Sequence, residues 1–341
     1  MSKRRTTLAD IAEALDMSPS TVSRALAGHE RISVATRRTV REMADRLKYR
    51  QNSLAASLRN GKTRLIGVLM PTINRSFFAS VVRGIEDVAG PAGYSIVVTQ
   101  NDDEPQKESS ALDALIRAQV DGVIASLSRN TTDYSSFSEL SDRRVPLVLF
   151  DRVSDRIQAS QVTIDDYHGA FLATQHLIDQ GCRYPVHLGG PQHLNIYQDR
   201  LNGFREAIEQ AGLPFNPYRQ IMMIDHTAEG GKQAAEELLA RSDPPDAIFS
   251  ASDWAATGAM RHLLSKGVRI PEDIAVVGFA NESFTAFLEP SLTTVEQFSR
   301  KIGQEAATIL MQQLEQSGTP KARKVRLKPE LIVRRSSLRT Q

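Results

Sequence analysis

The sequence predicts an α/β protein in which a small helical unit precedes a larger, two-lobed body. Two observations carry this prediction. The first 48 residues contain three short segments with helical periodicity. From residue 64 onward, near-continuous apolar runs alternate with amphipathic helical segments, and the alternation starts again near residue 161. Such runs are typical of parallel sheets covered on both faces, so we expect two doubly wound parallel sheets with a cleft between them.

The N-terminal segment has the signals of three short helices. A capping pattern at Thr7 precedes an apolar stripe with helical spacing. A second helix begins at Ser18-Pro19, and Ser33 precedes a third. Because a tight turn joins the first two helices, the pattern predicts a helix-turn-helix unit.

The net charge of +2 is unevenly distributed along the chain. Residues 1–60 contain 12 Lys and Arg against 6 Asp and Glu, a net +6, whereas the rest has 30 and 34, a net −4. A basic head on a mildly acidic body favours contact with a polyanion. A three-helix bundle without a ligand would show the same helix pattern. The basic charge and the hydroxyl-rich second helix favour DNA.

The body is expected to contain two consecutive sets of strands and helices. The first set has apolar runs at 64–71, 94–100, 121–127 and 145–151, with helical segments after the first and second. The second set begins near residue 161 and has strands at 185–190, 220–225, 247–252 and 274–280, with helices at 167–180, 200–211, 229–241 and 253–266. Ligands of such folds bind at the carboxyl ends of the strands.

Composition excludes several classes of protein. The single cysteine, Cys182, allows no disulfide within the chain, which suits a reducing cytoplasm. No apolar stretch resembles a signal peptide or reaches the length of about 18 residues that a membrane span needs. The glycine-rich segment 229–234 lacks the spacing of a phosphate-binding loop, and no residues show metal-ligand or catalytic spacing. We therefore expect a cytoplasmic protein that is not an enzyme and needs no cofactor.

The head contains three motifs, LADIA, STVSRAL and RISVATRRTV, in the order and spacing of one bacterial family. The body segments RLNGFREAIEQAGL, PPDAIFSASDWAATGAM, IPEDIAVVGF and PSLTTVEQ fit the same family. Over essentially its whole length the chain resembles the lactose-repressor (LacI/GalR) family of transcription factors, whose effector domain has the fold of periplasmic sugar-binding proteins. The resemblance implies a ligand-responsive regulator, a repressor of carbohydrate-related genes, that binds near-palindromic operator DNA as a homodimer.

The resemblance also divides the chain into parts. It places a helix-turn-helix head at 1–48, a hinge helix at 49–62, and an effector-binding and dimerisation body at 63–341. Within the body it implies three crossings between lobes, near residues 162, 290 and 326. These crossings assign about 63–162 and 291–325 to the N-lobe, and 163–290 and 326–341 to the C-lobe. No heptad pattern supports a tetramer.

Carried over residue by residue, the resemblance assigns DNA contacts to Thr7, Pro19, Ser20, Thr21, Ser23, Arg24, Tyr49, Asn52, Ala55 and Leu58. Arg24 is the expected donor to a guanine edge, and Thr21 an expected phosphate contact. Leu58 matches the leucine that the family inserts into the minor groove, although it could instead pack on its own body. Gln51 replaces the usual proline and Ala56 a common arginine, which predicts a less rigid hinge with one backbone contact fewer.

The resemblance places the effector at Phe77, Phe78, Asp151, Arg200, His226, Asp253 and Asn281. Arg200 is expected to anchor the ligand by charge-assisted hydrogen bonds, and the phenylalanines to stack on a ring. At least one phenylalanine could instead belong to the core, and Asp151 could cap a turn. Ala280 stands where the family usually has an aspartate that binds two sugar hydroxyls. A sugar or sugar derivative is expected, and an acidic or otherwise modified sugar fits better than a neutral hexose.

Two other classes of function remain open from the residues. A cytoplasmic sugar-binding protein without a regulatory role would use the body alone, and the missing signal sequence argues against a transport protein. A sugar-metabolising enzyme on the same body would need a paired acid and base or a set of metal ligands, and the sequence shows neither.

Overall fold

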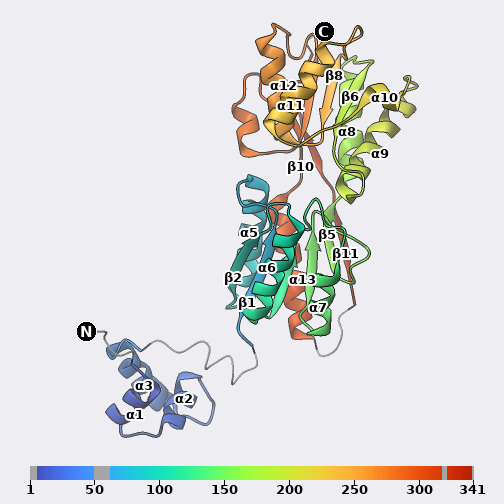
Figure 1. Cartoon of the computed structure of the whole chain (residues 1–341). Helices are drawn as coiled ribbons and strands as arrows, with labels where there is room; N and C mark the ends of the chain where they lie inside the picture. The colour runs from blue at the N-terminus through green and yellow to red at the C-terminus, as the bar shows by residue number, and fades with distance from the viewer. Residues whose placement is uncertain (1–5, 50–61, 317–320, 340–341) are drawn as a thin grey trace. The chain divides into compact units, whose positions relative to one another are not determined.

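The computed structural model describes residues 6–49, 62–316 and 321–339 of the 341 (Figure 1). The chain divides into two compact units, Met1–Thr63 and Arg64–Gln341. Most of the expected hinge lies outside the described residues, and with it the predicted hinge helix, Gln51, Asn52, Ala55, Ala56 and Leu58.

The first unit holds the three predicted helices, α1 (Leu8–Ala14), α2 (Pro19–Leu26) and α3 (Val34–Arg46). The side chains of Thr7, Ser18 and Ser33 each accept a hydrogen bond from a backbone amide in the first turn of the following helix. The small core that joins the helices consists of Ile11, Ala12, Val22, Ala25, Val40 and Ala44. The helix-turn-helix predicted from the capping signals and apolar stripes is therefore confirmed.

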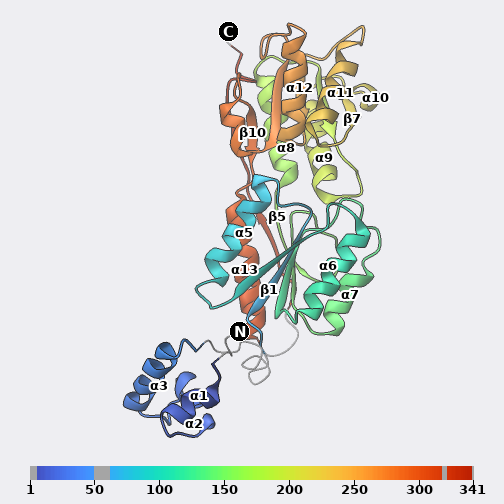
Figure 2. The same cartoon turned by 60° about the vertical axis from the view of Figure 1, so that its left-hand side comes forward.

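The N-lobe of the second unit is built on a six-stranded parallel sheet in the order β11-β5-β4-β3-β1-β2. Its strands are β1 (Leu65–Met70), β2 (Ser95–Gln100), β3 (Gly122–Ala125), β4 (Leu147–Phe150), β5 (Ser160–Ile164) and β11 (Lys324–Leu327). One face carries α5 (Ser76–Ala89) and α13 (Ser299–Glu315), and the other α6 (Pro105–Arg117) and α7 (Ser135–Asp142) (Figure 2). Helices on both faces explain why β3 and β4 are buried along their whole length.

The C-lobe repeats this architecture with a sheet in the order β12-β10-β9-β8-β6-β7, which is parallel except for β12. Its strands are β6 (Pro185–Gly189), β7 (Ile221–Met223), β8 (Ala247–Ser250), β9 (Ala275–Ala280), β10 (Thr293–Glu296) and β12 (Glu330–Ile332). Helices α8 (Asp166–Asp179) and α9 (Asn195–Gln210) cover one face, and α11 (Ala228–Leu239) and α12 (Asp253–Ser265) the other. The short α10 (Pro217–Gln220) and the 3-10 helix η1 (Ser283–Phe287) complete the lobe.

Helices α5 and α13 pack with unusually close backbones. A Cβ atom on Gly84 would lie 2.0 Å from the carbonyl oxygen of Arg300, and one on Gly303 would lie 2.0 Å from that of Val81. Only glycine fits at both positions. This close packing fixes α13, which follows the C-lobe strand β10 in the chain, onto the sheet of the N-lobe.

The chain crosses between the lobes three times, as predicted, but not at the predicted residues. The first crossing lies between β5 and α8 and the third between β11 and β12, within a few residues of 162 and 326. The expected second crossing near 290 is wrong, because Thr293–Glu296 pairs with β9 in the C-lobe sheet. The chain returns to the N-lobe only after β10, at residues 297–298.

In the described part of the chain, no helix is long and apolar enough to span a membrane.

Candidate DNA-binding surface and ligand pocket

Helix α2 presents its polar side chains to solvent and its apolar ones to the head core. Val22 and Ala25 are fully buried against the other two helices. Pro19, Ser20 and Arg24 are exposed, and the Nε atom of Arg24 donates to the Ser20 carbonyl at 3.3 Å. Residues four apart lie on one helix face. The exposed face of α2 therefore carries the short side chains of Pro19 and Ser20 at its start and the cationic side chain of Arg24 in its last turn.

The other predicted DNA contacts within the described residues have varied settings. Thr7 is exposed, and its hydroxyl also donates to Asp10 at 2.9 Å. Thr21 is half-buried and shares a hydroxyl contact of 2.9 Å with Ser18. Ser23 is half-buried on α2, and Tyr49 packs against the head core.

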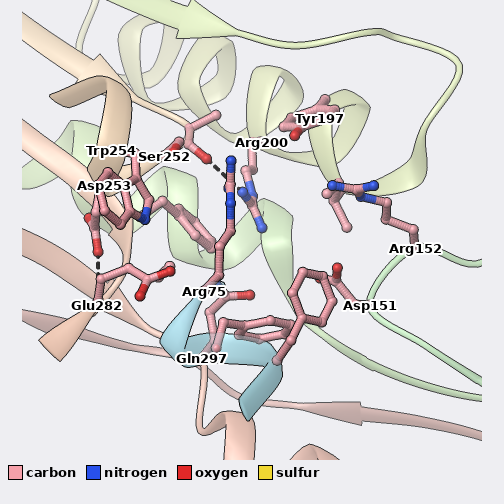
Figure 3. A pocket seen from close by; sticks show the side chains of 16 residues that line it. Arg75, Asp151, Arg152, Tyr197, Arg200, Ser252, Asp253, Trp254, Glu282 and Gln297 are labelled. Atoms are coloured by element: carbon pink, nitrogen blue, oxygen red, sulfur yellow. Dashed lines mark hydrogen bonds between the residues drawn. The ribbon is translucent and has the colours of Figure 1, made fainter. Parts of the chain in front are cut away.

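The second unit contains a pocket where the carboxyl ends of strands from both sheets meet (Figure 3). It holds about 460 Å³ of atom-free space, part of it open to solvent. Its lining comes from both lobes: Arg75, Phe77, Phe78, Asp151, Arg152, Ile196, Tyr197, Arg200, Ala251, Ser252, Asp253, Trp254, Phe279, Ala280, Glu282 and Gln297. Five of the seven predicted effector residues are among them, namely Phe77, Phe78, Asp151, Arg200 and Asp253.

Arg200 is held rigidly at the wall of the pocket. Its Nε and Nη2 atoms contact Oδ1 of Asp166 at 2.8 and 2.7 Å, and its Nη1 atom donates to the Ala251 carbonyl at 2.8 Å. Its guanidinium lies 3.7 Å from the centroid of the Phe279 ring. Burial raises the pKa of Asp166 to about 7, against the opposing effect of Arg200. The arginine predicted to anchor the ligand is thus pre-oriented by its own lobe.

Asp253 begins α12 and is 1 % exposed. Its Oδ1 atom accepts from the Thr294 hydroxyl at 2.6 Å, and its Oδ2 atom from the Glu282 amide at 2.8 Å. Burial raises its pKa to about 7. The carboxyl group thus ties α12 to β10 and to the loop after β9. The loop is thereby fixed where it lines the pocket.

Both phenylalanines line the pocket and also belong to the core of the N-lobe. Phe77 is 7 % and Phe78 3 % exposed, and their rings meet edge to face at 5.1 Å. The alternatives of core and pocket are therefore not exclusive. Asp151, which follows β4, has its backbone at φ 60°, and burial raises the pKa of its carboxyl group.

Two predicted effector residues do not line the pocket. The imidazole of His226 is buried behind Tyr197, with ring centroids 4.6 Å apart, and burial lowers its pKa far below the usual range. The amide of Asn281 donates to Glu296 at 2.6 Å and accepts from Arg334 at 2.8 Å. Ala280 lines the pocket with φ 131° and Asn281 follows with φ 49°, so the backbone turns the asparagine side chain away.

Sequence reasoning did not find several charged, polar and aromatic residues of the pocket, among them Arg75, Arg152, Tyr197, Glu282 and Gln297. Arg152 directly follows the predicted Asp151, and Glu282 follows the end of β9. Position just after the carboxyl end of a strand was a signal that could have found both. Arg75 lies in the loop after β1, and the sequence does not show how far that loop reaches.

Hydrogen bonds join the lobes around the pocket. Arg75 donates from Nη2 to the His226 carbonyl at 3.0 Å, and the amide and hydroxyl of Ser76 donate to Glu282. Nearby, the side chain of Asn195 donates to the Asp151 carbonyl at 3.2 Å and accepts from the Val153 amide at 3.1 Å. The lobes are therefore in contact over the mouth of the pocket.

A second inter-lobe contact involves Arg129. It contacts Asp225 at 3.3 Å, and its carbonyl oxygen lies 2.8 Å from the Nε2 atom of His193.

Across residues 6–49, 62–316 and 321–339, no group of three or more His, Cys, Asp or Glu side chains is arranged to hold a metal ion.

Two family descriptions match the chain. Residues 7–52 match bacterial regulatory proteins of the lacI family, and residues 174–337 match a periplasmic binding protein-like domain. The ribose operon repressor of Halalkalibacterium halodurans is 34% identical over 311 residues, which cover 91% of each chain. The transcriptional repressor CytR of Escherichia coli is 32% identical over 309 residues, 91% of this chain and 90% of CytR.

Solved structures agree in fold along the whole chain. A lac repressor dimer bound to operator and the anti-inducer ONPF has a TM-score of 0.87 at 26% identity, covering 98% of this chain and 100% of that one. A CelR–cellobiose complex has a TM-score of 0.74 at 30% identity, covering 97% and 100%. The chain therefore belongs to the LacI family of bacterial regulatory proteins, and it is a helix-turn-helix DNA-binding transcription regulator and not an enzyme.

Proposed function

We propose that the protein is a homodimeric repressor that binds near-palindromic operator DNA through its N-terminal unit. A sugar or sugar derivative occupies the pocket between the lobes and changes the affinity for the operator. The protein acts in the cytoplasm on carbohydrate-related genes. The observation that carries this proposal is the pocket itself, in which rings and charged groups from both lobes line one space.

The relatives support the proposed DNA binding, the dimer and the sugar ligand. The lac repressor structure is a dimer on operator DNA. CelR holds cellobiose, and a LacI-family regulator of Enterococcus faecium, with a TM-score of 0.69 at 27% identity, holds ribose. Two heads on one dimer can reach two half-sites, so a dimer would favour a near-palindromic operator.

The DNA contacts are proposed for Thr7, Pro19, Ser20, Thr21, Ser23, Arg24, Tyr49, Asn52, Ala55 and Leu58. Among them Arg24 is the only long cationic side chain, and it is exposed on α2. An arginine bound to both acceptors of a guanine contributes about 1–3 kcal/mol of discrimination. Arg24 is therefore the position at which base recognition is most directly tested.

Replacing Arg24 with alanine is expected to weaken specific operator binding about 10- to 100-fold. Fluorescence anisotropy with labelled DNA from upstream of the gene measures the affinity, at two salt concentrations because phosphate contacts make it salt-dependent. Arg38→Ala is the matched control, because Arg38 is an exposed arginine of α3 that pairs with Glu42. Equal affinities for wild type and Arg24→Ala would refute the assignment of α2 as recognition helix.

The same measurement separates the proposal from its main alternative, a cytoplasmic sugar-binding protein without a regulatory role. Such a protein would bind a ligand in the pocket and show no preference for its own upstream DNA over random DNA. A regulator shows that preference, and it loses the preference in Arg24→Ala.

A further inference from the structure

The pocket is lined by three arginines, Arg75 and Arg152 from the N-lobe and Arg200 from the C-lobe (Figure 3). Burial raises the pKa of the Asp151 carboxyl group, and all three arginines act in the opposite direction. All three guanidinium groups are therefore within electrostatic reach of one point in the pocket, the carboxylate of Asp151. The three guanidinium groups differ in whether a carboxylate pairs with them.

Two of the three arginines make ion pairs with carboxylates that do not line the pocket. Arg152 contacts Asp103 at 2.5 Å, and Arg200 contacts Asp166 at 2.7 Å. Arg75 differs, because it makes no ion pair with any carboxylate in the described part of the chain. Its Nη2 atom donates to a backbone carbonyl, that of His226. Burial lowers the pKa of Arg75, and the Glu282 carboxylate opposes this shift without pairing with the guanidinium. A half-buried guanidinium with no carboxylate in contact costs free energy unless a ligand supplies one.

Arg152 also has an unused hydrogen-bond donor, which is a second and independent observation. The residue is 5 % exposed, and its Nε atom is buried without a hydrogen-bond acceptor among the described residues. Buried donors in folded proteins nearly always have an acceptor, so an unused one at a pocket wall calls for an explanation. An oxygen atom of a bound anion is an acceptor of the right kind.

The carboxylates of the pocket do not offer equivalent acceptors. Glu282 accepts from the amide and hydroxyl of Ser76, and Asp253 from Thr294 and the Glu282 amide. Of the three carboxylates among the described residues that line the pocket, only that of Asp151 makes no hydrogen bond. Ala280, at the end of β9, contributes a methyl group. Three arginines and three carboxylates thus line the pocket. Of these groups, Arg75, the Nε atom of Arg152 and the Asp151 carboxylate keep hydrogen-bonding capacity for a ligand.

We infer that the ligand of this pocket is a hydroxylated ring or chain compound that carries an anionic group, a carboxylate or a phosphate. Arg75 and Arg152 bind the anion, and the Asp151 carboxylate accepts from hydroxyl groups. Phe77, Phe78 and Trp254 provide apolar surface for the carbon skeleton. This inference rests on the proposed ligand site and narrows the class of its ligand.

The test uses the full chain and matched sets of probes. Each set contains a neutral pentose or hexose, the corresponding sugar acid, and the corresponding sugar phosphate. Thermal unfolding finds the compounds that bind, because a ligand of the native state raises the melting temperature. Titration calorimetry then measures affinities. We expect an acid or a phosphate to bind at least tenfold tighter than its neutral parent, and the stronger of the two identifies the anion.

Variants of Arg75 locate the effect. Arg75→Gln is expected to lose at least tenfold in affinity for the anionic probe, whereas Arg75→Lys, which keeps the charge, retains most of it. Arg83→Gln is the matched control, because Arg83 is an exposed arginine on α5 that pairs with Glu86. Ala280→Asp adds a carboxylate to the pocket and is expected to weaken anion binding more than its uncharged counterpart Ala280→Asn.

The outcomes distinguish the inference from the proposed function. A neutral sugar that binds as tightly as its acid and phosphate, and changes operator affinity, overturns the inference and leaves the proposed function standing. Anion binding that is equal in Arg75→Gln and wild type also overturns it. No binding by any probe in the sets counts against both.

Discussion

Burial determines the protonation of two carboxyl groups at the pocket: Asp253, which lines it, and Asp166, which lies behind Arg200. Asp253 and Asp166 are both 1–2 % exposed, and burial raises the pKa of each to about 7. Asp166 compensates the charge of Arg200, whereas Asp253 has a hydroxyl and an amide as partners. Among the residues that the structure describes, no cation contacts Asp253, so its deprotonation places an unpaired negative charge in a buried site, which opposes folding.

Stability is expected to depend on pH through Asp253. Its pKa is about 7 in the folded protein and about 3.9 in an unfolded chain. The folded state therefore binds more protons between these values, so the contribution is complete below about pH 4 and is lost as pH rises through about 7. Between pH 5 and 8, wild type should lose about 2–3 kcal/mol relative to Asp253→Asn. Urea unfolding of both proteins at pH 5, 6.5 and 8 measures this difference, and parallel profiles would contradict it.

The same residues show how far a sequence reveals a site. Asp151, Arg200 and Asp253 were predictable, because strand ends and family motifs mark them. The direction of the Asn281 side chain was not predictable, because the positive φ angles at 280 and 281 turn it away from the pocket. Arg75 was missed because its side chain reaches the pocket through a contact with the other lobe, the carbonyl of His226. Contacts across a cleft leave no local pattern.

At the scale of elements, the sequence predicts helices and strands well, and their pairing less well. Buried runs and capping residues identify β3, β4 and the three head helices, because burial and caps act locally. The second crossing was misplaced because Thr293–Glu296 belongs to the lobe of its pairing partner, β9. That pairing joins residues about 16 positions apart. The sequence of a four-residue strand does not specify which of the two sheets it joins.

The packing of α5 on α13 is expected to tolerate no added methyl group. Alanine usually stabilises a helix relative to glycine by about 1 kcal/mol. In Gly84→Ala, however, the new Cβ would lie 2.0 Å from the Arg300 carbonyl, and such overpacking costs about 1–3 kcal/mol or more. We therefore expect net destabilisation, measured as a lower denaturant midpoint. Glu86→Ala, an exposed change on the same helix, is the control. An unchanged or higher midpoint in Gly84→Ala would show that the helices can separate at no cost.

At the scale of the whole molecule, function depends on coupling between two binding events. The lobes contact each other through Arg75, Ser76 and Arg129, and the pocket that these contacts surround is lined by both lobes. A ligand that binds there interacts with both lobes at once and therefore favours one relative position of them. If that position also affects operator binding, linkage requires the operator to change ligand affinity by the same factor.

The central claim is that a ligand in the inter-lobe pocket changes operator affinity, and a titration of operator binding with and without ligand tests it most directly. The tightest probe from the matched sets, at saturation, should change the operator Kd by about 5- to 150-fold. Asp151→Asn, which alters the pocket carboxylate and nothing in the head, should raise the half-effective ligand concentration at least tenfold and leave the ligand-free Kd unchanged. An operator Kd that stays the same while calorimetry shows the ligand bound would contradict the claim.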